Sequence, residues 1–237
     1  MTMDRELYKI DYEFVFSKLD RKFYHILLDP ETISIVRPEP ESLPSWTKLE
    51  HQQCKECPLK PTEHLYCPIA VNIFEIVEEF KEMISYTECL VRCTTPERIY
   101  LKKTTIMEGL SSIFGIIMAT SDCPVMDFFK PMARFHLPFS SVEETTVRVV
   151  SMFILQQYFE HGKDGNLNLD MEQLVQQYDR VNSVNEGLFT RIRSLGNKDA
   201  DKNAIIMLHS LSQILSSDID YRMESISYLF TPQKQKE

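Results

Sequence analysis

Hydrophobic and polar residues alternate with a period of two in the first third of the chain, a pattern typical of β-strands. The clearest example is LYKIDYEFVF at 7–16, where Ile10, Tyr12, Phe14 and Phe16 fall on one face. Further runs rich in aromatic and β-branched residues occupy 23–28, 32–36, 87–93 and 98–103. Together these segments predict a small antiparallel sheet.

A helical repeat, with apolar residues three or four positions apart, first appears at 68–84 and dominates from residue 104 onward. We expect helices at 106–120, 124–133, 141–161, 169–194 and 200–217. Ser140 and Ser141 each precede a glutamate by three positions, a capping-box pattern that favours a helix start there.

These segments predict an α+β fold, with a small N-terminal antiparallel sheet and a Cys-rich loop continuing into a C-terminal helical bundle. The β-rich part covers 1–103 and the helical part covers 104–230. Because no flexible linker separates the parts, we expect residues 1–230 to form a single unit. The polar end TPQKQKE, 231–237, is expected to be a disordered tail.

The charge and the apolar content of the chain indicate which kinds of partner it can bind. The 237 residues carry 26 Lys and Arg against 35 Asp and Glu, a net charge of −9 that argues against binding nucleic acid. The most apolar stretch, GLSSIFGIIMAT at 109–120, is shorter than the ~20 residues that span a membrane. The charged start MTMDRELYKI lacks the apolar core of a secretory signal. We therefore expect a cytoplasmic protein with neither nucleic acid nor membrane as a partner.

The segment HQQCKECPLKPTEHLYCP at 51–68 concentrates thiols and imidazoles in a polar stretch. In a reducing compartment, clustered cysteines point to metal or redox chemistry more often than to disulfides. Structural zinc sites take four tetrahedral ligands of these two kinds. The spacing predicts a zinc site whose ligands are His51, Cys54, Cys57 and Cys67.

Several alternatives to this ligand set stay open. His64 could replace His51 as the imidazole ligand, and Cys123, which precedes a proline as Cys67 does, could complete a four-cysteine site. Four thiolates would suit an iron–sulfur cluster as well as zinc. The plainest alternative is a loop with unligated free cysteines.

A second group of reactive side chains lies at 120–144, in a stretch stiffened by three prolines. Lys130, Arg134 and His136 could form a weak anion pocket together with the helix start near 141. Cys123 and His136 could also act as nucleophile and base, although no catalytic motif surrounds the cysteine. A structural role, in which Arg134 and His136 bond carbonyls and carboxylates and fix the irregular chain, is simpler than either.

Two sequence blocks, HQQCKECPL…LYCPIAVN and SDCPVMDFFKPMARFHLPFSSVEET, resemble a family of uncharacterised bacterial cytosolic proteins defined by a domain of unknown function. The resemblance covers most of the chain from YEFVF onward. It implies a bacterial origin, and it brings no activity, cofactor or ligand set.

Three functional hypotheses follow, in order of preference. The first is a binding module whose loop holds a structural zinc and supports an interaction surface for a protein partner. The second is a redox or metal sensor that uses the same thiols or an iron–sulfur cluster. The third is an enzyme centred on Cys123, Arg134 and His136.

Overall fold

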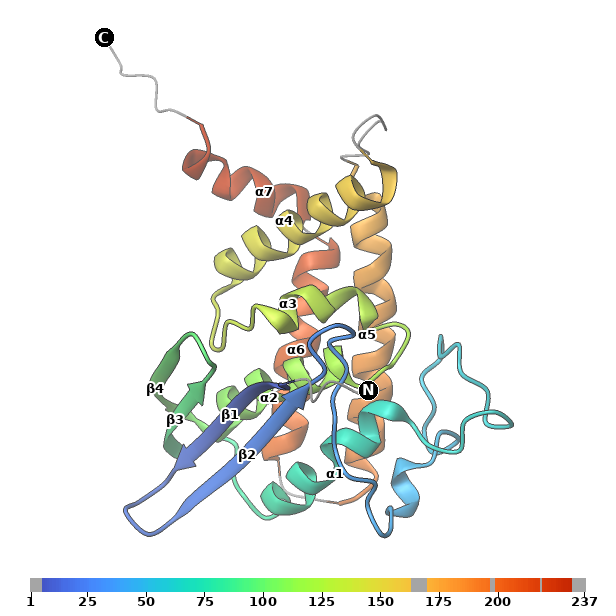
Figure 1. The fold of residues 1–237 in the computed structure, drawn as a ribbon, viewed down its shortest axis with the longest axis vertical. Coiled ribbons are helices and arrows are strands. Elements are labelled where there is room, and N and C mark those ends of the chain that lie inside the picture. The colour runs from blue at the N-terminus through green and yellow to red at the C-terminus, as the bar shows by residue number, and fades with distance from the viewer. Residues whose placement is uncertain (1–5, 163–169, 197–198, 218, 232–237) are drawn as a thin grey trace.

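A four-stranded sheet occupies one end of the molecule and helices extend from it to the other end (Figure 1). This computed structural model describes residues 6–162, 170–196, 199–217 and 219–231. The predicted α+β class is confirmed, with the sheet in the N-terminal part and the helical region after it. The predicted tail at 232–237 lies outside the described residues.

The sheet consists of β1 (Tyr8–Val15), β2 (Arg21–Leu28), β3 (Glu88–Thr94) and β4 (Ile99–Thr105). All neighbouring strands are antiparallel, in the order β2-β1-β3-β4. The expected alternation is confirmed, because Ile10, Tyr12 and Phe14 are fully buried while the residues between them are partly exposed. On β3, Cys89, Val91 and Cys93 share the same buried face.

Helix α2 (Ile106–Thr120) packs against that buried face, and one glycine permits the close approach. A Cβ atom at Gly109 would lie 2.4 Å from the ring of Phe14 and 2.9 Å from a methyl group of Val91. A larger residue at position 109 would therefore push the helix away from the sheet.

The remaining helices are α1 (Pro68–Phe80), α3 (Lys130–Arg134), α4 (Val142–His161), α5 (Glu172–Arg193), α6 (Ala200–Ser217) and α7 (Ile219–Ile226). Helix α5 runs along most of the molecule, and α4 and α7 lie at the end far from the sheet (Figure 1). Of the two candidate caps, Ser141 forms the capping box with Glu144 at the start of α4. No described helix combines the length and the apolar character needed to cross a membrane.

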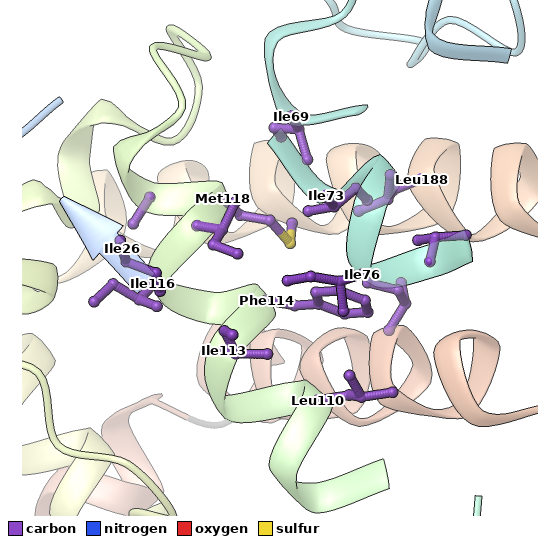
Figure 2. Packing of buried hydrophobic residues seen from close by; sticks show 14 of the residues in the cluster. Ile26, Ile69, Ile73, Ile76, Leu110, Ile113, Phe114, Ile116, Met118 and Leu188 are labelled. Carbon is purple, nitrogen blue, oxygen red and sulfur yellow. The ribbon is translucent and has the colours of Figure 1, made fainter. Parts of the chain in front are cut away.

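Two hydrophobic clusters fill the interior. The larger joins the sheet to α1, α2, α5 and α6, and Figure 2 shows Ile73 of α1 and Leu188 of α5 close to Phe114 and Met118 of α2. The smaller cluster lies between α4, α5 and α7. Helix α5 contributes residues to both clusters, so it links the sheet end of the molecule to the far end.

Two predicted elements are wrong in detail. The segment 32–36 makes only an isolated bridge between Leu28 and Ile35 and is not a strand. The segment 124–133 contains a turn, a 3₁₀ helix at Asp127–Phe129 and the short α3, so no helix begins at Pro124.

Candidate functional site

The cysteine loop, residues 50–64, is closed at its base by backbone pairing. The N–H of Leu49 donates to the carbonyl of Leu65 (2.9 Å), and the N–H of Cys67 donates to the carbonyl of Thr47 (2.8 Å). Lys48 and Tyr66 form an antiparallel bridge between these two bonds. The pairing therefore holds both ends of the loop together and sets Cys67 next to its base.

Within the loop, Cys54 and Cys57 lie on a tight turn, in which the N–H of Cys57 donates to the carbonyl of Cys54 (3.1 Å). The turn rests on α5, where the Cys54 thiol donates to the carbonyl of Val184 (3.9 Å). A Cβ atom at Gly187 would lie 2.6 Å from the Cys54 sulfur. Only glycine at this position lets the loop approach the helix so closely.

Two more cysteines come from other elements. Cys67 is the N-cap of α1, with Pro68 as the first helical residue, as its sequence context predicts. Cys123 follows α2 in a turn, where the N–H of Met126 donates to its carbonyl (2.8 Å). The expected helix start is therefore absent at Cys123, but the N–H groups of Val125 and Met126 still face its thiol and favour the charged form.

The pKa values of Cys54 and Cys123 indicate that these four thiols lie within electrostatic range of one another. Burial, followed by the groups of Cys67, Cys57 and Cys123, raises the pKa of Cys54 to about 12. The pKa of Cys123 is raised to about 11, mainly by burial and to a smaller extent by Cys67 and Cys57, against the lowering by the N–H groups of Val125 and Met126. Such mutual effects act over short distances, because Coulomb interactions weaken with separation. We refer to Cys54, Cys57, Cys67 and Cys123 as the cysteine cluster.

The thiols of the cysteine cluster do not form a metal-coordination shell in this structure. Among the described residues, no three His, Cys, Asp or Glu side chains form a group arranged to hold a metal ion. All six cysteines are free thiols, and Cys89 and Cys93 lie apart from the cluster in the sheet.

The predicted ligand His51 and its alternative, His64, have different surroundings. The Nε2 atom of His51 is 3.0 Å from the hydroxyl of Ser194 at the end of α5, and burial lowers the pKa of this imidazole. His64 is exposed on the loop. Cys123 thus influences the pKa of Cys54, while the imidazole of His51 contacts a hydroxyl group.

Arg191 of α5 is a central residue of the site that the sequence does not indicate. Its side chain is only 2% exposed, and Nη1 donates to the carbonyls of Trp46 (2.5 Å) and Lys48 (2.6 Å), while Nη2 donates to that of Leu49 (3.3 Å). No carboxylate among the described residues pairs with it. Burial lowers the pKa of Arg191, and the groups of Cys67, Cys54 and Cys57 act in the opposite direction. A buried cation thus lies beside the thiols and ties the start of the loop to α5.

The residues of the predicted anion pocket occupy three different environments. Lys130 pairs with Asp122 and Asp127, each at 3.0 Å. Arg134 pairs with Glu97 (3.7 Å) and stacks over a tyrosine ring. His136 is half-buried, and its Nε2 lies 2.5 Å from the Tyr12 hydroxyl. Lys130 and Arg134 therefore already pair with carboxylates, and the anion pocket stays a prediction.

Arg134 pairs with a carboxylate as expected, and a second arginine, Arg148, also fixes the irregular chain between α2 and α4. Nη2 of Arg148 on α4 donates to the carbonyls of Met132 (3.0 Å) and Phe135 (2.9 Å). This is the role that the sequence suggested for Arg134, and Arg148 escapes notice there because it lies within a regular helix.

Comparison with known proteins assigns the chain to a family. A domain of unknown function, DUF6901, matches residues 10–231. The chain belongs to the DUF6901 family. No curated protein and no solved structure matches it. The DUF6901 match spans both the cysteine loop and the stretch at 120–144, so both regions are parts of the family domain, while the predicted bacterial origin stays a prediction.

Proposed function

We propose that this DUF6901 protein is a cytoplasmic metal-binding module in which the cysteine cluster holds a structural zinc ion. One observation supports the proposal: Cys57 of the loop turn, Cys67 at the N-cap of α1 and Cys123 after α2 all raise the pKa of Cys54, whose thiol rests on α5 beside Gly187. Four thiolates are a complete ligand set for structural zinc. The cluster replaces the predicted ligand His51 by Cys123.

The surroundings of the cluster fit a zinc–thiolate centre. Zinc with four thiolates keeps a net negative charge, and the buried guanidinium of Arg191 would offset part of it. Turns like that from Cys54 to Cys57 let two ligands bind the same metal. Because the sulfurs do not form a shell in the described arrangement, zinc binding would draw them together and tighten the loop against α5.

The biological role that we propose for the centre is structural support of an interaction surface. The loop is rich in Lys, Glu and Gln and contributes few apolar residues to the core, so coordination would supply the ordering energy that burial does not. The exposed part of the loop would then be presented to a protein partner in one conformation.

Metal analysis of the untagged protein, purified without oxygen, tests the zinc proposal. We expect about one zinc per chain in the wild type and in the control Cys89→Ser, which alters a buried thiol of the sheet. Cys57→Ser and Cys123→Ser should each lose most of the metal. A wild-type content below ~0.2 equivalents of any transition metal would contradict the proposal.

The all-thiol composition of the cluster favours one alternative, an iron–sulfur cluster in a redox or metal sensor. The visible spectrum of the same anaerobic sample separates the two, because an iron–sulfur protein is coloured and a zinc protein is colourless. His51→Gln gives an independent check of the ligand set. This variant should keep its metal, since the imidazole contacts Ser194.

A further inference from the structure

A cavity of about 610 Å³ is lined by residues of both hydrophobic clusters. Residues of α2, α3, α4, α5 and α6 line it. Its volume falls inside the range of roughly 300–1,000 Å³ that is typical of small-molecule sites. Helices do not leave such a gap where their side chains interdigitate fully, since protein interiors are close-packed.

The walls are largely apolar and adaptable. Four of the lining residues are methionines, namely Met107, Met118, Met126 and Met132. Methionine side chains are flexible and polarisable, so they adjust to ligands of different shape. The walls therefore suit a hydrocarbon chain or ring better than a polar metabolite.

Polar groups with unused hydrogen-bonding capacity meet in one region of the lining. Arg148 uses only Nη2 in its bonds to the chain, and no carboxylate of the described residues forms an ion pair with it. Glu144 is near enough to influence it, but that carboxylate accepts the N–H of Ser141 in the capping box. Tyr178 is only 4% exposed, and its hydroxyl has no partner within the described residues.

His136 completes this polar region. Its Nε2 is shared with the Tyr12 hydroxyl, and Nδ1 has no hydrogen-bond partner in the part of the chain that the structure describes. Arg148, His136 and Tyr178 all line the cavity, and the charge of Arg148 acts to lower the pKa of the other two. The cavity lining thus includes a guanidinium without an ion-pair partner among the described residues, a neutral phenol and a neutral imidazole, in addition to the Lys102–Glu108 ion pair.

We propose that the cavity binds a small apolar monocarboxylate, with the hydrocarbon against the methionine-rich wall and the carboxylate on Arg148. Guanidinium and carboxylate form two parallel hydrogen bonds when donors are free, and the pair gains strength in a partly dry site. The hydroxyl of Tyr178 can donate to the same carboxylate. A neutral lipid would leave these donors unused, and a cationic amphiphile would be repelled. This site is independent of the proposed metal centre.

Titration calorimetry of the full chain with decanoate, decan-1-ol and decylammonium tests the ligand class, because the three probes share one chain and differ in charge. We expect decanoate to bind at least about tenfold more tightly than decanol, and decylammonium to bind most weakly. Equal affinity for decanoate and decanol, tighter binding of decylammonium, or no binding of decanoate would each overturn the proposal.

Variants of Arg148 and Tyr178 test the polar region. Arg148→Met should weaken decanoate about tenfold and leave decanol nearly unchanged. Because this change also removes two bonds to backbone carbonyls, Tyr178→Phe serves as a milder second variant that removes only an unpartnered hydroxyl. It should weaken decanoate by about threefold. If both single variants, Tyr178→Phe and Arg148→Met, fold and bind decanoate as the wild type does, the assigned position of the carboxylate is refuted.

Gly115 on α2 offers a matched pair that tests the location. A Cβ atom there would meet only Leu208, at an ordinary 3.7 Å, so Gly115→Ala fits and should bind decanoate as the wild type does. Gly115→Leu would fill part of the cavity and should weaken decanoate and decanol alike by at least about tenfold. Wild-type binding by a folded Gly115→Leu variant would show that the ligand sits elsewhere.

Discussion

Replacing Arg191 by methionine tests the interactions that hold the cysteine loop on α5. Methionine keeps an apolar stem of similar length but removes every hydrogen-bond donor and the charge. The carbonyls of Trp46, Lys48 and Leu49 then lose their shared donor in a place that water reaches poorly.

The expected size of the effect follows from those three bonds. A hydrogen bond to a charged group contributes roughly 1.5–3 kcal/mol, and relief from burying the guanidinium offsets part of the sum. We therefore expect Arg191→Met to lower the free energy of unfolding by about 4 kcal/mol. Because domains are commonly stable by roughly 5–15 kcal/mol, the variant should still fold.

Urea unfolding followed by circular dichroism and by tryptophan fluorescence measures this loss. The chain has one tryptophan, Trp46, whose carbonyl accepts a bond from Arg191, so fluorescence reports on the loop base itself. Arg193→Met is the matched control on an exposed position of the same helix and should cost less than about 0.5 kcal/mol. Arg191→Lys keeps the charge but has a single nitrogen, so it should recover only part of the stability.

The reasoning fails if Arg191→Met costs no more than Arg193→Met. Full recovery in Arg191→Lys would show that charge, and not the forked arrangement of donors, fixes the loop. Either result would also weaken the proposal that the buried guanidinium of Arg191 offsets the negative charge of a zinc–thiolate centre.

Three further expectations concern other parts of the fold. Burial, and then the charge of Arg148, lowers the pKa of His136 from 6.5 to about 3. The contribution of the neutral imidazole to folding stability is therefore complete above pH 6.5 and is lost as the pH falls towards 3. Stability should decline by up to about 1.4 kcal/mol per pH unit there, and His136→Gln should flatten that slope in pH-dependent urea unfolding. Ser141→Ala should cost about 1 kcal/mol in thermal unfolding, and the control Ser140→Ala, outside the capping box, should cost less. Gly187→Ala should destabilise the fold by about 1–3 kcal/mol, because its Cβ atom would meet a cysteine sulfur at 2.6 Å. The control Gly115→Ala has room for its methyl group and should stabilise the helix slightly. Equal effects of the two variants in urea unfolding would contradict the close contact at Gly187.

Local sequence patterns predict most of the elements, because hydrophobic periodicity is itself a local property. Helix α2 matches its expected bounds, 106–120, and β3 is displaced by one residue from the expected 87–93. The order β2-β1-β3-β4 could not be predicted in this way, since it depends on pairing between segments far apart in the chain.

The segment 124–133 shows where local reasoning fails. Pro124 is acceptable at a helix start, and apolar residues follow at helical spacing. In the structure the N–H of Met126 closes a turn on the carbonyl of Cys123, and the helix proper begins only at Lys130, with Pro131 in its first turn. Two prolines compatible with a helix start lie close together, and only tertiary contacts decide between them.

The parts of the candidate site that could be predicted are those whose residues lie close together in the sequence. The turn between Cys54 and Cys57 follows from two intervening residues, and the N-cap position of Cys67 follows from the next proline. Arg191 lies more than a hundred residues from the carbonyls that it binds, and Gly187 matters only because α5 passes beneath the loop. No local pattern in the sequence carries either fact.

The closure of the cysteine loop by the protein itself determines how much of the fold a bound metal would need to stabilise. Small zinc fingers are unfolded without metal, because they have too little core to order their ligands. In this protein, backbone pairing at Leu49 and Cys67 and the bonds of Arg191 already close the loop beside a large hydrophobic cluster. The entropy cost of bringing the ends together is therefore met by the fold itself. Metal binding would need to order only the thiol side chains and the exposed part of the loop, so zinc would fix the loop's conformation while the sheet and helices remain folded without it.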